Sequence, residues 1–262
     1  MIKALRTAAS GMAAQQLNVD VISNNLANVN TTGYKKSKAE FQDVLYQNIR
    51  QAGTSSAIGT SVPTGLSVGY GVRPASTVRQ YSVGEFQFSG NPLDVAINGN
   101  GFFEVQLPDG SSGYTRDGSL KMSADGQLVT TDGYFLLPNI TIPEDATSVS
   151  IGSDGSVEVM QYGQSDPTNV GQIELVRFIN PAGLTAIGRN ILVQTSASGD
   201  PVSDVPGQGG LGSIDQGYLE MSNVQVVDEM VNMIIAQRAY EMNSKAIQTS
   251  DDMAALANNL KR

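Results

Sequence analysis

The sequence predicts an α+β protein, in which coiled-coil-forming helices at the N- and C-termini pair at one end and a mainly antiparallel β domain is inserted between them. Three observations lead to this prediction. One heptad pattern runs through the first 30 residues, a second runs through the last 28, and the residues between them contain repeated Asp-Gly pairs. Heptads are typical of coiled coils, whereas Asp-Gly between short alternating stretches is typical of β-hairpins.

The N-terminal heptad is strict. Its positions are separated alternately by three and four residues, and seven of the eight are apolar. They are Leu5, Ala8, Met12, Gln15, Val19, Ile22, Leu26 and Val29. We expect Asn30-Thr31-Thr32-Gly33 to end this helix, because glycine readily takes the left-handed conformation just past a helix terminus.

The C-terminal helix repeats the pattern. Its heptad positions are Ile235, Ala239, Met242, Ala246, Thr249, Met253, Leu256 and Leu260. Ser222 or Asn223 is the expected N-cap region, with Asp228 and Glu229 early in the helix, where its dipole favours anions. A single amphipathic helix would usually pack on its own domain. Two strict heptad patterns at opposite ends of one chain instead favour helices that pair with each other and leave further helix surface for contact with other subunits.

Between the helices the sequence has the features of strands and turns. Residues 51–72 are rich in Gly, Ser and Thr and are expected to form an extended arm or a long loop. From Arg73 to about Gly217 strands are expected, with hairpin turns at the Asp-Gly pairs that begin at Asp109, Asp117, Asp125, Asp132 and Asp154. Residues 194–213 are expected to form another loop.

The expected organisation therefore has three parts. Residues 1–33 and 221–262 form a helical axial polymerisation domain, residues 34–72 form an extended arm or connector, and residues 73–220 form a mainly β outer domain.

Composition and charge exclude several functions. The net charge is −9, and residues 51–219 carry six Lys/Arg against sixteen Asp/Glu, which argues against a nucleic-acid surface. The chain has no Cys and no His, so disulfides, thiolate catalysis and the usual zinc ligand sets are excluded. No run is apolar enough for a membrane span or for the core of a cleaved signal peptide.

No motif predicts catalysis or a cofactor. Asp125, Asp132 and Asp154 lack calcium-loop spacing and are explained by turns. The segment Gly99-Asn100-Gly101 lacks the third glycine of a dinucleotide fingerprint and is expected to be a turn. Arg116 beside Asp117 is expected to be a surface pair rather than a catalytic couple. We therefore expect no catalytic, cofactor-binding or metal-binding residues and no small-molecule substrate.

Two segments resemble the signatures of flagellar rod and hook proteins. They are VDVISNNLANVNTTGYKKSKAEFQDVLYQ at 19–47 and GYLEMSNVQVVDEMVNMIIAQRAYEMNSKAIQTSDDM at 217–253. Residues 91–105 and 113–136 resemble the β domain of the same family. The positions that carry the terminal signatures are Asn24, Asn25, Leu26, Asn28, Gly33, Tyr34, Arg238 and Tyr240.

The resemblance implies a non-enzymatic subunit of the distal rod of the bacterial flagellum. Such a subunit polymerises with itself into a rigid hollow shaft that crosses the periplasm and transmits torque to the hook. The implied partners are proximal rod proteins, the hook protein, the peptidoglycan and outer-membrane ring proteins, and the flagellar export apparatus, which exports the chain without cleaving a signal peptide.

Residues 46–75 resemble the stretch that distinguishes distal-rod members of the family from hook members. We interpret this stretch as an arm that stiffens the shaft, with Arg50, Pro63, Gly65 and Arg73 as its marker residues. Two alternatives stay open from the sequence. One is a hook or proximal rod subunit of the same family, and the other is a secreted β-rich carbohydrate hydrolase with a carboxylate pair.

Overall fold

The computed structural model describes residues 2–52, 55–57, 60–61, 63–163 and 166–259. The chain divides into two compact units. The helical unit contains Met1–Leu26, Ser37–Val78 and Gln225–Arg262, and the β unit contains Ala27–Lys36 and Arg79–Val224. Long terminal helices and a mainly antiparallel β region between them confirm the predicted α+β class.

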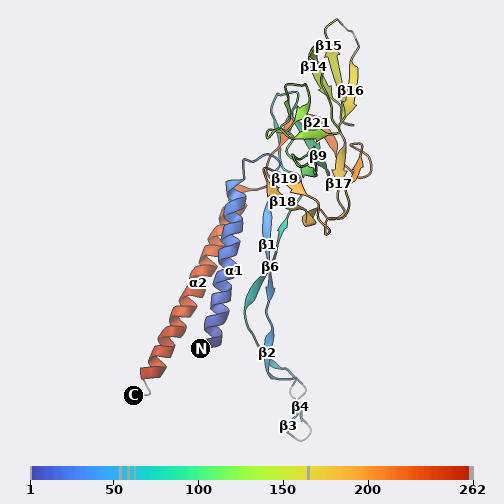
Figure 1. The fold of residues 1–262 in the computed structure, drawn as a ribbon. Helices are drawn as coiled ribbons and strands as arrows, with labels where there is room; N and C mark the ends of the chain where they lie inside the picture. The colour runs from blue at the N-terminus through green and yellow to red at the C-terminus, as the bar shows by residue number, and fades with distance from the viewer. Residues whose placement is uncertain (1, 53–54, 58–59, 62, 164–165, 260–262) are drawn as a thin grey trace. The chain divides into compact units, whose positions relative to one another are not determined.

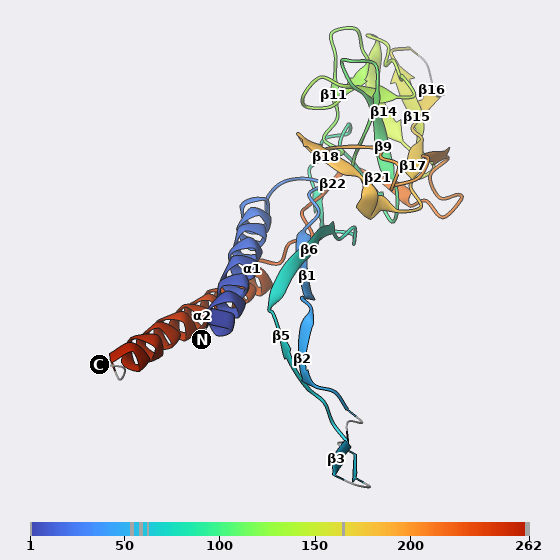
Figure 2. The same ribbon diagram turned by 60° about the horizontal axis from the view of Figure 1, so that its bottom comes forward.

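Helices α1 (Ile2–Ala27) and α2 (Val226–Asn259) lie side by side in the helical unit, and they run antiparallel (Figures 1 and 2). Helix α1 ends two residues before the last predicted heptad position, so Val29 lies in the turn that follows the helix. Gly33 has a φ of 67°, which confirms the left-handed glycine expected beyond the helix. None of the described helices is long and apolar enough to cross a membrane.

The N-terminus of α2 corrects the predicted N-cap region. The helix begins at Val226, and the Glu229 N–H donates to the carbonyl of Gln225. The Asn223 side chain instead accepts from the Lys36 N–H and donates to the Gln80 carbonyl, both at 2.8 Å. Asn223 therefore joins segments of the β unit and does not cap the helix. Asp228 and Glu229 lie in the first turn, as expected.

The described strands between Ser37 and Arg79 form a two-stranded ribbon. Strand β1 (Ser37–Asp43) pairs with β6 (Val72–Arg79), and β2 (Tyr46–Arg50) pairs antiparallel with β5 (Leu66–Gly69). The short strands β3 (Ser55–Ala57) and β4 (Thr60–Ser61) pair beyond them. The part of residues 51–72 that the structure describes thus contains paired strands, which favours the arm over the loop.

The ribbon contacts α1 within the helical unit. The Val72 N–H donates to the Ser10 hydroxyl at 3.3 Å, and the Lys3 ammonium donates to the Gln47 side chain. A Cβ at Gly71 would lie 2.1 Å from the Ser10 oxygen, so only glycine permits this close approach.

In the described part of the β unit the largest sheet has nine strands. Its main path runs β11-β12-β13-β9-β10-β19-β18, while β17 pairs with β9 and β20. A separate three-stranded sheet contains β14, β15 and β16, and smaller ladders join β21 to β8 and β22 to β7. The strands are β7 (Phe86–Phe88), β8 (Val95–Asn98), β9 (Phe102–Gln106), β10 (Ser112–Thr115), β11 (Lys121–Met122), β12 (Leu128–Val129), β13 (Phe135–Leu137), β14 (Ala146–Ile151), β15 (Ser156–Gln161), β16 (Thr168–Gln172), β17 (Leu175–Arg177), β18 (Thr185–Gly188), β19 (Ile191–Val193), β20 (Val202–Asp204), β21 (Ser213–Gln216) and β22 (Tyr218–Glu220).

Two apolar clusters hold the β unit together. The larger cluster is mainly aliphatic and includes Ile97, Phe103 and Leu136, all fully buried. In the smaller cluster, Phe178 makes edge-to-face contacts with Phe102 and Tyr114. Aliphatic side chains from many short strands thus take the place of a large aromatic core in a chain without Trp.

Four of the five predicted Asp-Gly hairpin turns are confirmed. The pairs beginning at Asp109, Asp125, Asp132 and Asp154 join neighbouring antiparallel strands. The prediction at Asp117-Gly118 is wrong, because β10 and β11, which flank this pair, do not pair with each other. A Cβ at Gly118 would lie 1.6 Å from the Val95 carbonyl oxygen, so this glycine serves a close backbone approach.

Two further turn predictions can be compared with the structure. Gly99 and Gly101 both have positive φ between β8 and β9, which confirms the predicted turn there. The expected loop at 194–213 is interrupted by β20, which pairs with β17.

Candidate assembly interface

The two helices meet along a row that mixes small, polar and large apolar residues. The Asn25 side-chain amide donates to Glu229 on α2 at 3.3 Å, and both side chains are buried. Further along, a Cβ at Gly11 would lie 2.8 Å from the Asn243 side chain, so the helices approach closely at this point. Asn25 also donates to the Ser37 carbonyl at 2.8 Å and accepts from the Ser37 N–H at 2.9 Å. One signature residue thus joins α1, α2 and the start of β1.

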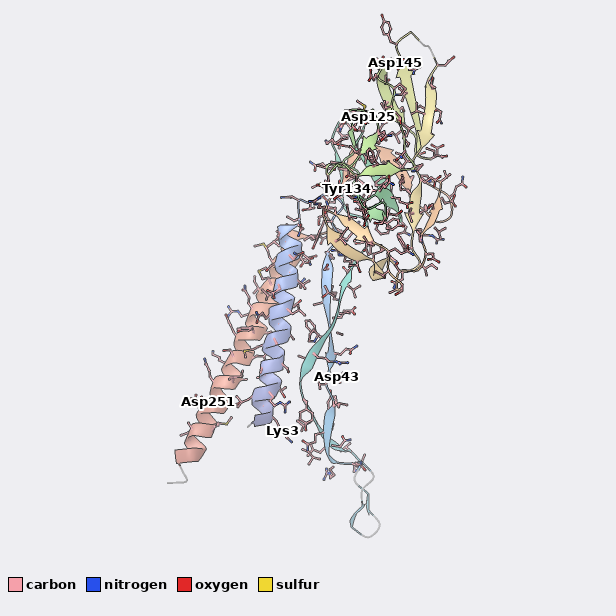
Figure 3. All side chains as sticks on the ribbon, viewed as in Figure 1. Lys3, Asp43, Asp125, Tyr134, Asp145 and Asp251 are labelled. Carbon is pink, nitrogen blue, oxygen red and sulfur yellow. The ribbon has the colours of Figure 1, made fainter. Side chains whose placement is uncertain are left out.

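Helix α2 has two rows with heptad spacing. The inner row is buried or half-buried and consists of Glu229, Met233, Ala236, Asn243, Ile247, Ser250 and Ala254. The outer row is the predicted one, and its large side chains are exposed: Ile235 by 62%, Met242 by 69% and Leu256 by 62%. Met253 is also exposed, and Leu260 lies outside the described residues. Figure 3 shows side chains projecting along α2 as far as Asp251.

On α1 the predicted row is only partly covered. Ile22 is buried, and Leu5, Met12, Val19 and Leu26 are half-buried. The contacts at Gly11 and Asn25 lie one position before Met12 and Leu26, so the predicted row borders the surface that α2 covers. That the chain ends pair is confirmed, whereas a role of the two predicted rows in assembly stays a prediction.

The other terminal signature residues have different surroundings. Arg238 forms an exposed ion pair with Glu241 at 3.2 Å, an arrangement that contributes little to stability. Tyr240 lines a groove between the helices together with Gln16 and Val19. Asn24 is exposed on α1, while Asn28, Gly33 and Tyr34 belong to the β unit.

The arm residues lie on the exposed ribbon. Arg50 is on β2 opposite Leu66, and Pro63 and Gly65 precede β5. A Cβ at Gly65 would lie 3.0 Å from the Arg50 carbonyl oxygen. Arg73 is on β6 and donates to the Gln42 side chain at 3.2 Å. The ribbon also exposes Leu45, Tyr46, Ile49, Leu66 and Val68, a set of apolar side chains available for contact with another chain.

The β unit contains a buried charge cluster that sequence reasoning missed. Glu220 pairs with Lys35 at 2.5 Å and with Arg116 at 2.9 Å, and all three side chains are almost fully buried. The expectation that Arg116 forms a surface pair with Asp117 is therefore wrong. No periodicity marks these three residues, which come from distant parts of the sequence.

Backbone groups complete this cluster. Lys35 also donates to the Ser82 carbonyl at 2.7 Å, and Glu220 accepts from the Gly84 N–H at 2.9 Å. The Arg116 guanidinium donates to the carbonyls of Ile97, Gly99 and Gly101. Burial lowers the pKa of Lys35, the neighbouring Arg116 charge lowers it further, and Glu220 opposes both effects. The cluster joins residues that follow α1 to residues that precede α2.

These features are typical of a structural protein. Its terminal helices expose an apolar row, and the β region inserted between them is held together by buried ion pairs. Residues 5–35 match the family described as flagella basal body rod protein. Residues 96–159 match the D1 domain of flagellar hook protein FlgE/F/G, and residues 215–260 match the C-terminal region of flagellar basal body rod FlgEFG protein.

Full-length relatives agree with these matches. The chain is 53% identical to the flagellar basal-body rod protein FlgG of Borreliella burgdorferi, with 100% of both chains covered. It is 51% identical to the FlgG of Caulobacter vibrioides over 99% of this chain and 100% of the relative. It is 42% identical to the FlgG of Bacillus subtilis over 100% of both. The chain therefore belongs to the FlgG family of flagellar basal-body rod proteins, and it is a structural subunit of the flagellar distal rod.

Proposed function

We propose that the chain polymerises through its terminal helices into a rigid, hollow, helical shaft that transmits motor torque to the hook. The observation that carries this proposal is the exposed outer row of α2. Helix α2 covers α1 with its inner row and leaves Ile235, Met242 and Leu256 in solvent. A second copy that buries this row removes large apolar side chains from water, at about 1.5–3 kcal/mol for each fully buried side chain.

The geometry of the pair suits an open polymer. The apolar rows of α1 and α2 differ in sequence, so the two helices offer different surfaces. A contact that joins the outer row of α2 in one subunit to a different surface of the next subunit is heterologous. Heterologous contacts that do not close a ring build helical filaments. The helices then form the inner tube and the β units an outer layer.

The setting of the shaft is proposed from family membership and from the resemblance described above. The rod spans the periplasm, and its subunits leave the cytoplasm through the flagellar export apparatus without cleavage of a signal peptide. The chain contacts proximal rod proteins, the hook protein and the peptidoglycan and outer-membrane ring proteins. It has no enzymatic activity, and its work is mechanical.

Electron microscopy of the purified chain tests the polymerisation proposal. At high protein concentration the full chain is expected to form straight tubes. A chain without residues 227–262 lacks nearly all of α2 and is expected to form none, while its β unit, which ends at Val224, keeps its far-ultraviolet circular dichroism. Tubes formed by the truncated chain in a sedimentation assay would contradict assembly through the helices.

The ribbon is proposed to stiffen the shaft by lying over neighbouring subunits. Deleting Ser55 to Leu66 leaves both helices intact, so export and polymerisation are expected to continue. The filaments are expected to become curved or flexible, because the shortened arm no longer reaches over axial neighbours to restrain them. The measurement is persistence length by electron microscopy in one buffer. Equal persistence lengths in the deletion and the wild type would remove the stiffening role and reopen the hook or proximal-rod alternative.

A further inference from the structure

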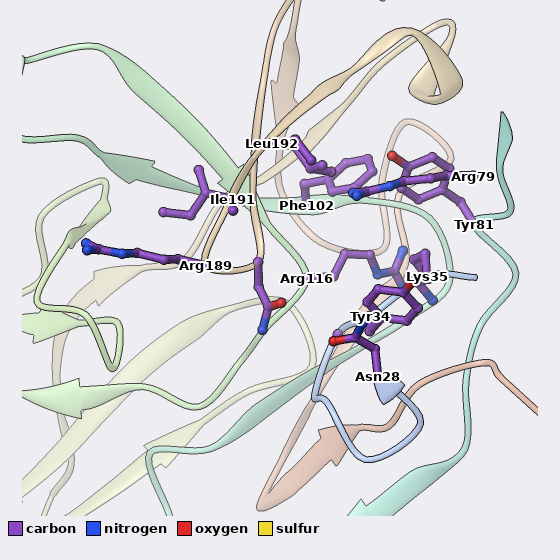
Figure 4. Close-up of a pocket in the computed structure, with 14 residues that line it drawn as sticks. Asn28, Tyr34, Lys35, Arg79, Tyr81, Phe102, Arg116, Arg189, Ile191 and Leu192 are labelled. Carbon is purple, nitrogen blue, oxygen red and sulfur yellow. The ribbon is translucent and has the colours of Figure 1, made fainter. Parts of the chain in front are cut away.

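The β unit has a cationic pocket that the assembly rows do not use. Its volume is 210 Å³, and four basic side chains contribute to its lining, Lys35, Arg79, Arg116 and Arg189 (Figure 4). None of its lining residues is acidic. Three of these residues, Arg79, Arg116 and Arg189, belong to the strongly acidic region 51–219.

Three of the four basic groups already have partners. Lys35 and Arg116 hold Glu220 and backbone carbonyls, and Arg189 donates to the Tyr134 hydroxyl at 2.9 Å. Arg79, like Arg189, forms no ion pair with any carboxylate among the residues that the structure describes. The pocket therefore contains two guanidinium groups, those of Arg79 and Arg189, whose charges are not compensated by an ion pair in the described residues.

Tyr81 adds a second group in need of a partner. Its hydroxyl is buried, and no group within the described ranges accepts a hydrogen bond from it, since the Arg79 guanidinium that interacts with it can only donate. Figure 4 shows Tyr81 and Arg79 together on one side of the pocket, next to Phe102. Burial raises the pKa of Tyr81 and nearby Arg79 opposes this effect, so the phenol stays protonated at neutral pH and can donate. A buried polar group without a partner destabilises the fold, and an acceptor in the pocket would remove that cost.

The size and the donors favour a carboxylate. At 210 Å³ the pocket is smaller than the roughly 300–1,000 Å³ of sites that take drug-sized molecules. A carboxylate can accept two parallel hydrogen bonds from the planar arginine fork, and its oxygens can also accept from a phenol.

We propose that this pocket binds a side-chain carboxylate of a neighbouring copy of this chain. The proposal rests on the proposed polymerisation, which brings copies together. Residues 51–219 carry sixteen Asp/Glu against six Lys/Arg, so a neighbouring β unit presents mostly carboxylates. Acidic surfaces repel one another in a filament, and a cationic pocket that receives one carboxylate offsets this repulsion and fixes the contact geometry.

The test compares two charge reversals in the full chain. Arg79→Glu places a carboxylate in the pocket and is expected to raise the critical concentration for polymerisation at least about tenfold, equivalent to roughly 1.4 kcal/mol. Arg177→Glu makes the same change in charge at an exposed position on β17 outside the pocket and is expected to change it less than about twofold. Both variants are expected to keep the thermal unfolding transition of the wild type. Equal effects of the two reversals on assembly would overturn the proposal.

A monomer experiment separates this proposal from polymerisation itself. The wild-type monomer is titrated with sodium acetate and, in a second arm, with inorganic phosphate, and NMR shifts are followed. Acetate shifts confined to pocket residues and lost in Arg79→Gln support a carboxylate site even if no tubes form. Shifts with phosphate alone, or no shifts with either anion, overturn it.

Discussion

Replacing Glu220 with alanine is expected to lower the free energy of unfolding of the β unit by about 3–5 kcal/mol. The substitution leaves Lys35 and Arg116 buried with no opposing charge, and it removes the acceptor of the Gly84 N–H. Breaking a buried pair from one side is much more costly than the net contribution of the pair, because the remaining ions stay desolvated. Urea unfolding followed by far-ultraviolet circular dichroism measures the change.

Two further variants make this measurement specific. Glu144→Ala removes a carboxylate from an exposed position of the same unit and is expected to change stability by no more than about 0.5 kcal/mol. Lys35→Met added to Glu220→Ala removes one of the two orphaned cations and is expected to recover part of the loss. A loss below about 1 kcal/mol for Glu220→Ala would show that the cluster is hydrated in solution and does not hold the unit together.

Aspartate in the outer row is expected to abolish assembly. Met242→Asp or Leu256→Asp introduces a charge that polymerisation would bury without a partner, at a cost of several kcal/mol. Since every 1.4 kcal/mol is a factor of ten, the critical concentration should rise by about a hundredfold or more. Sedimentation of a concentration series measures it.

The same helix offers a matched control. Gln248 is exposed and belongs to neither row of α2, so Gln248→Asp adds the same charge and nearly the same loss of helix propensity. It is expected to assemble almost as well as the wild type. If Leu256→Asp instead lowered the thermal transition of the isolated subunit as strongly as it lowered assembly, Leu256 would belong to the core of the subunit.

Hydrophobic spacing predicted both helices but not the row by which they pair. Apolar periodicity on α2 selects Ile235, Met242 and Leu256. In the row that faces α1, apolar residues are interrupted by Glu229, Asn243 and Ser250. Small and polar side chains allow a close helix approach, but they give no signal in a hydrophobicity pattern. On α2, the more uniformly apolar of the two rows is therefore the one that the subunit leaves exposed.

Local turn chemistry predicted four hairpins of the β unit, and long-range contacts account for the failures. The Asp-Gly rule depends on residues adjacent in sequence, so it holds wherever the flanking strands pair with each other. At Gly118 the determining neighbour is Val95, whose carbonyl leaves no space for a side chain. The charge cluster also depends on long-range contacts. Its members Arg116 and Glu220 lie 81 and 185 positions beyond Lys35 in the sequence.

The lengths of the two helices have a consequence for the end of the chain. Helix α1 has 26 residues and α2 has 34, and the contacts Asn25–Glu229 and Gly11–Asn243 fix their register. This register places the start of α1 beside Asp252, so α2 extends past α1 by about two turns, or about 10 Å. That overhang includes Met253 and Leu256 and has no α1 of its own subunit beside it. In the proposed polymer, the exposed Met253 and Leu256 of this stretch are expected to pack on a helix of the next subunit, so the register of the helix pair would set the axial stagger between subunits.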